Sequence, residues 1–107
     1  MKTFVLPFAL ALFAITSAAS EQDLLSKANS RDYQAQRNLA YGYASGSGGQ
    51  RKDVAEACAW YLLVLRSNSP KLDVSDVGNM ATYCDKLPWD ERLVAEKRAN
   101  ALQRKIY

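Results

Sequence analysis

Residues 38–61, NLAYGYASGSGGQRKDVAEACAWY, hold the end of one helical pattern, a turn and the start of another helical pattern. Before the turn, apolar residues recur at the three- and four-residue spacing of a helix, which we expect over residues 31–45. The GSGG segment at 46–49 favours the left-handed conformation that ends helices, and Asp53 can cap the helix that follows. The stretch therefore predicts an antiparallel helical hairpin.

The helix after Asp53 is apolar on nearly all of its faces. Cys58, Trp60 and Leu63 lie on different sides of it, and a helix that is apolar all round is a buried one. Such a helix needs neighbours on both flanks, so we expect a second hairpin after the break SNSPK at 67–71.

The second hairpin is predicted from a third helix capped by Asp73 and a fourth that begins in KLPWDER at 86–92. No segment shows the alternation typical of strands, so the expected fold class is all-α. The residues expected to face inward are Val74, Val77, Met80, Ala81 and Cys84 in the third helix, and Ala95, Ala99, Leu102 and Ile106 in the fourth.

The N-terminus has the pattern of a secretory signal peptide over residues 1–19. Lys2 precedes an apolar stretch, and Ser17 and Ala19 are the small residues that a signal peptidase requires. A membrane anchor or a buried helix is the alternative for this segment. Residues 20–30 then form an N-terminal arm or a short helix, and the mature protein is expected to be periplasmic or secreted.

The first hairpin also matches the residue pattern of a known family, at Ala35, Gln36, Asn38, Leu39, Tyr43, Gly46, Gly48, Ala57, Trp60 and Tyr61. The first unit is similar to a Sel1-like repeat, a relative of the tetratricopeptide repeat, and residues 73–104 are similar to a degenerate closing unit of such proteins. The resemblance implies that residues 31–107 form a short right-handed α-solenoid of two stacked antiparallel hairpins, used as a protein-interaction scaffold without chemistry of its own.

Cys58 and Cys84 are the only cysteines, and both fall on apolar helix faces. They flank the turn near Ser69 at similar distances along the chain, so an antiparallel pair of helices would bring them level. In an oxidising compartment this predicts a disulfide, with two buried free thiols as the alternative. Two thiols without histidine are too few for a zinc site or a Cys-His nucleophile.

Other catalytic patterns are also missing. The chain has no histidine, and none of its lysines follows a serine by three residues. Asp90 with Glu91, and Asp73 with Asp76, are typical of helix starts rather than of acid–base pairs. A formal net charge of +3 is too weak to indicate nucleic acid. We therefore expect no catalysis, no metal and no cofactor.

Tyr33, Arg37 and Tyr41 recur every four residues on the side of the first helix opposite Leu39. Tyrosine and arginine are enriched at protein interfaces, so this side of the helix is the predicted partner-binding surface. Burial of the two tyrosines by the N-terminal arm is the alternative. Trp89 is either a cap on the last helix or a further exposed anchor.

These features together predict an exported, non-enzymatic module that binds another protein in the periplasm or outside the cell. An inhibitor or immunity protein against a secreted toxin or cell-wall enzyme would suit so small a single domain. The alternatives are a self-associating structural subunit of an envelope assembly and a small hydrolase with an unrecognised site. No stable membrane insertion is expected, and a homo-oligomer stays open.

Overall fold

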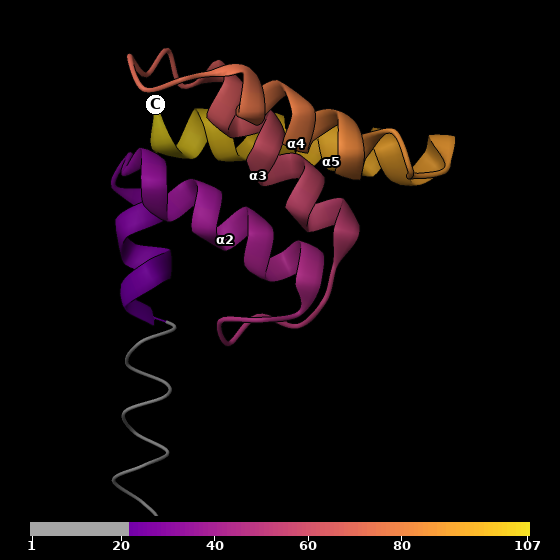
Figure 1. Cartoon of the computed structure of the whole chain (residues 1–107), viewed down its shortest axis with the longest axis horizontal. Helices are drawn as coiled ribbons and strands as arrows, with labels where there is room; N and C mark the ends of the chain where they lie inside the picture. The colour runs from indigo at the N-terminus through magenta and orange to yellow at the C-terminus, as the bar shows by residue number, and fades with distance from the viewer. Residues whose placement is uncertain (1–21) are drawn as a thin grey trace, which may run out of the picture.

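A computed structural model describes residues 22–107, and across these residues it contains helices, turns and loops but no strand (Figure 1). The expected all-α class is confirmed, whereas the predicted signal peptide at 1–19 lies outside the described residues. No helix within 22–107 combines the length and the apolar character needed to cross a bilayer. A helical segment covers 22–29, and it is followed by α2 (Tyr33–Ser45), α3 (Val54–Arg66), α4 (Val74–Cys84) and α5 (Trp89–Ile106).

Aspartates start three of these helices, as the sequence predicts for Asp53 and Asp73. The Asp32 carboxylate accepts the N–H of Ala35, and Asp53 caps α3 in the same way. Asp73 opens α4 with a reciprocal capping box. Gly46 ends α2 in the left-handed conformation, with φ of 76°.

The helix α3 is the centre of the molecule. Its residues from Ala57 to Val64 are all buried, which confirms the expectation of a helix covered on every side. Figure 1 shows α2, α4 and α5 arranged around α3, and each of them packs against it. Ala95, Ala99, Leu102 and Ile106 form the buried side of α5, as predicted.

The predicted inward face of α4 is wrong for two residues. Val74 is 85% exposed and Val77 is 51% exposed, while Asp76 is buried. Apolar periodicity alone would turn the valines inward. The helix instead faces the core with its Asp76 and Cys84 side, because both side chains are bonded to other helices.

The disulfide between Cys58 and Cys84 joins α3 to the end of α4 and confirms the predicted pairing. The two Cα atoms lie 5.0 Å apart, and both residues are fully buried. The bridge therefore closes a loop that contains the α3–α4 connection and most of α4.

The C-terminal end of the chain lies beside the turn that precedes α2 (Figure 1). Arg31 has a φ of 70°, an uncommon conformation for a residue with a side chain. From there its Nε donates to the Ile106 carbonyl over 2.8 Å, and its guanidinium lies 5.2 Å from the centre of the Tyr107 ring. Gln36 adds a hydrogen bond of 3.2 Å to the Tyr107 hydroxyl. These contacts fasten the start of α2 to the end of α5, and we call them the terminal clasp.

Reducing the disulfide should lower the free energy of unfolding by about 3 kcal/mol, because the open chain gains loop entropy when it unfolds. For a domain of this size the melting temperature should then fall by more than about ten degrees. Calorimetry of the oxidised protein and of a Cys58→Ala/Cys84→Ala variant measures the difference. Equal melting temperatures would show that the bridge contributes nothing to stability.

Candidate partner-binding groove

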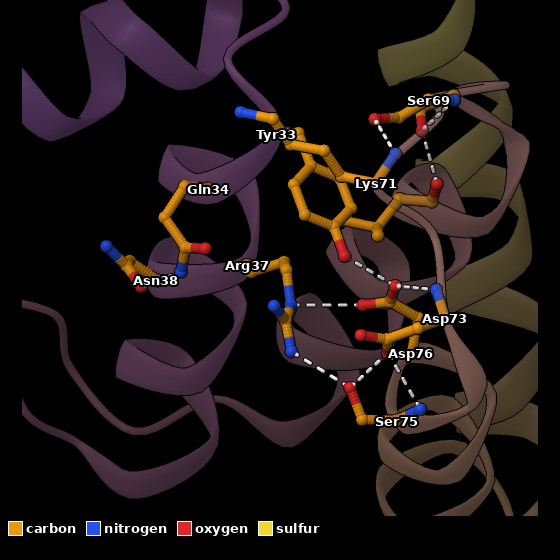
Figure 2. Close-up of polar contacts among 11 residues, drawn as sticks. Tyr33, Gln34, Arg37, Asn38, Ser69, Lys71, Asp73, Ser75 and Asp76 are labelled. Carbon is orange, nitrogen blue, oxygen red and sulfur yellow. Dashed lines mark hydrogen bonds and ion pairs between the residues drawn. The ribbon is translucent and has the colours of Figure 1, made fainter.

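A buried carboxylate connects α2 to the start of α4 (Figure 2). The Tyr33 hydroxyl donates to Oδ2 of Asp76 over 2.6 Å, and the backbone N–H of Asp73 donates to the same oxygen over 3.1 Å. Nε of Arg37 lies 3.0 Å from Oδ1, and the Asp76 side chain has no exposed surface. We call this set of contacts the Asp76 cluster.

The cluster holds Arg37 in one orientation. Besides its ion pair with Asp76, its Nη2 donates to Oγ of Ser75 over 3.2 Å. The guanidinium carbon is 5.4 Å from the centre of the Tyr33 ring. A flexible side chain is thus positioned from several sides, yet a quarter of its surface stays open to solvent.

Arg37 borders a shallow groove of about 230 Å³ between α2 and α4. Tyr61 of α3 contributes to its wall, and its ring stacks on that of Tyr83 with centres 5.4 Å apart. Tyr41 is 56% exposed and therefore accessible at the edge. The full lining is Gln34, Arg37, Asn38, Tyr41, Tyr61, Asn79 and Tyr83.

The structure separates the residues that the sequence singled out for partner binding. Arg37 and Tyr41 line the groove, but Tyr33 is only 9% exposed and is not on an outward face. It is covered by the start of α4, whose Asp76 binds its hydroxyl. Trp89 is 79% exposed at the start of α5, and it does not belong to the groove lining.

Sequence reasoning missed the amides of the groove. Asn38 and Asn79 are each the sixth residue of their helices, α2 and α4. Equivalent positions on the first helices of two successive hairpins are the signal that could have linked them. On α2, Gln34 donates to Oδ1 of Asn38 over 2.9 Å, which orders the amides on that wall.

Burial changes the acidity of two tyrosines beside the groove. It raises the pKa of Tyr33 to about 12, and the hydrogen bond to Asp76 adds to this effect. Burial also raises the pKa of Tyr61 to about 12, with a smaller contribution from Tyr83. The pKa of Asp73 is lowered because its carboxylate accepts hydrogen bonds from the side chain and the backbone of Ser75.

Comparison with models of known protein families, with curated proteins and with solved structures found no match to this chain. The similarity to Sel1-like repeats therefore stays a prediction. Within residues 22–107, no group of three or more His, Cys, Asp or Glu side chains is arranged to hold a metal ion.

Replacing Arg37 by alanine should lower the free energy of unfolding by about 1.5–3 kcal/mol, the range for a hydrogen bond to a charged group. The reason is that the Asp76 carboxylate stays buried while it loses its cation. Urea unfolding measures the change, with Tyr41→Ala as the exposed control on the same helix. A loss no larger than that of the control would contradict this role of the Asp76 cluster.

Stability should also fall steeply in strong alkali. Tyr33 and Tyr61 have a raised pKa of about 12 when folded, against about 10 when unfolded. Between these values the unfolded chain releases protons that the folded chain keeps, so the stabilisation present below pH 10 is lost as the pH rises. Between about pH 10 and pH 12, each tyrosine should lower the free energy of unfolding by up to about 1.4 kcal/mol per pH unit.

Urea unfolding across this alkaline range tests the effect, and Tyr33→Phe should make the decline less steep. A decline as steep in Tyr33→Phe as in the wild type would show that Tyr33 does not contribute.

Proposed function

We propose that the protein is an exported, non-enzymatic module that binds another protein through the groove between α2 and α4. The observation that carries this proposal is the groove itself, where tyrosines, amides and one positioned arginine share a solvent-accessible surface. Tyrosine and arginine are enriched at protein interfaces and often dominate their energy. The amides of Asn38 and Asn79 offer donors and acceptors to a partner's polar groups.

The way the groove is built favours tight recognition. Its two walls belong to different helices, and the Asp76 cluster and the Cys58–Cys84 disulfide hold α4 against the rest of the molecule. A surface that is ordered before binding loses less conformational entropy when the partner arrives. The groove thus has side chains that are typical of protein interfaces, on helices whose positions are fixed before the partner binds.

We also propose that the helices form a Sel1-like solenoid and that the protein acts in an oxidising compartment. In a Sel1-like solenoid, α2–α3 and α4–α5 would be successive hairpins with the groove along their first helices, although here α4 and α5 each pack mainly on α3. The disulfide supports an oxidising compartment, such as the periplasm or the cell exterior, reached through the signal peptide at 1–19. An inhibitor or immunity protein acting on a toxin or a cell-wall enzyme is the specific form that we propose.

Affinity capture followed by titration tests the proposal. The wild-type protein, Tyr41→Ala and Asn79→Ala are immobilised and exposed to the exported proteins of the source organism, with Val94→Ala on α5 as control. The groove variants should bind the captured partner about 30-fold more weakly, since an interface anchor is worth about 2 kcal/mol. Calorimetric titration with the purified partner measures this ratio.

Trp89→Ala distinguishes the groove from the other exposed aromatic surface. If Trp89→Ala abolishes binding while Tyr41→Ala and Asn79→Ala do not, the partner binds at the start of α5 and the groove proposal is wrong. If a captured enzyme or toxin keeps its full activity in the complex, the inhibitor role is wrong although the binding role stands.

A further inference from the structure

One side of α4 is apolar and uncovered. Val74, Val77, Gly78 and Ala81 follow one another at the spacing of a single helix face, and we call them the α4 stripe. Val74 is 85% exposed, Val77 is 51% exposed, Gly78 is exposed and Ala81 is partly exposed. An apolar helix face of this kind is expected to be covered by another element.

The middle of the stripe is open enough for a second helix. A methyl group added at Gly78 would meet nothing within 4 Å. Helices approach each other most closely where glycine and alanine leave the backbone uncovered, and Gly78 and Ala81 provide two such positions. The valines beside them project outward. The stripe therefore has two projecting side chains, Val74 and Val77, and two positions with little or no side chain, Gly78 and Ala81.

These four residues are complementary to a second copy of themselves. Two α4 helices placed antiparallel, with the two-fold axis between Val77 and Gly78, set Val77 of each copy against Gly78 of the other. The same arrangement sets Val74 of each copy against Ala81 of the other. Each large side chain thus meets a small one, and each contact occurs twice about the axis, as in an isologous interface.

The charges at the two ends of the stripe agree with this arrangement. Lys71 lies in the turn that precedes the N-cap of α4, and Asp85 is the C-cap residue of α4. Both are exposed, although Asp85 also accepts a hydrogen bond of 3.4 Å from Arg92. In the antiparallel pair, Lys71 of each copy approaches Asp85 of the other. Antiparallel helices also place opposite ends of their dipoles together.

From this fit of shape and charge we propose that the protein forms a closed two-fold dimer through the α4 stripe. The partner-binding groove would stay accessible in the dimer. Asn79 and Tyr83 line the groove, and at about 100° per residue they lie on the flank of α4 away from the stripe. The dimer would therefore present two grooves, and its formation does not depend on the function proposed for them.

Analytical ultracentrifugation over a range of concentrations tests the dimer. The wild-type protein should pass from the monomer mass to twice that mass in the micromolar range expected for a small interface. Val77→Glu should raise the dissociation constant at least about tenfold, because it buries a charge at the axis. Val94→Glu is the matched control, since Val94 is a 60% exposed valine on α5 and should leave dimerisation unchanged.

Cysteine cross-linking tests the register. Among residues 22–107 neither cysteine is free, so Gly78→Cys introduces a single thiol beside the proposed axis. A short bifunctional thiol reagent should convert Gly78→Cys to covalent dimer and leave Lys97→Cys, on α5, largely monomeric. A wild-type protein that stays monomeric at all concentrations overturns the proposal. So does a dimer weakened equally by both glutamate variants, or one linked more efficiently through Lys97→Cys.

Discussion

The buried carboxylate of Asp76 determines how α4 is rotated, and both surfaces of interest depend on that rotation. A buried carboxylate without partners is strongly unfavourable, so α4 cannot turn away from the Tyr33 hydroxyl and the Arg37 guanidinium without losing stability. The side of α4 that reaches α2 then carries Asn79 into the groove. The valines of the α4 stripe are left in solvent for the same reason. One polar contact between distant segments thus produces a polar groove and an apolar stripe on two flanks of one short helix.

The helix α4 is attached at both of its ends. The Asp76 cluster holds its first turn, and the disulfide from Cys84 to Cys58 holds its last residue. Between these points much of its apolar surface faces outward and adds little burial to the core. Covalent and ionic contacts therefore perform for α4 the task that hydrophobic packing performs for α3. This division explains why so short a helix can be held in a fixed position while it exposes two valines.

Local patterns in the sequence were sufficient for much of the fold. Asp53 and Asp73 marked helix starts, the apolar run around Trp60 marked the central helix, and the two cysteines indicated their own pairing. The bond from Tyr33 to Asp76 spans 43 positions, and no local pattern indicates such a contact. Periodicity showed that one side of α4 is apolar, but it could not show that a buried acid would turn that side outward. The groove was anticipated only through Arg37 and Tyr41, because Asn79, on its other wall, belongs to a helix whose rotation was unknown.

The terminal clasp changes how the chain is expected to lose its structure. In linear arrays of helical repeats each unit touches only its neighbours, so an end unit can fray while the rest stays folded. Here Arg31 and Gln36 hold Tyr107 and the carbonyl of Ile106, so the contacts run from α2 through α3 and α5 back to α2. The start of α2 and the end of α5 cannot separate without breaking these contacts. We therefore expect this closed circuit to make unfolding more cooperative, and a substitution at Tyr107 to loosen the contacts where α2 begins.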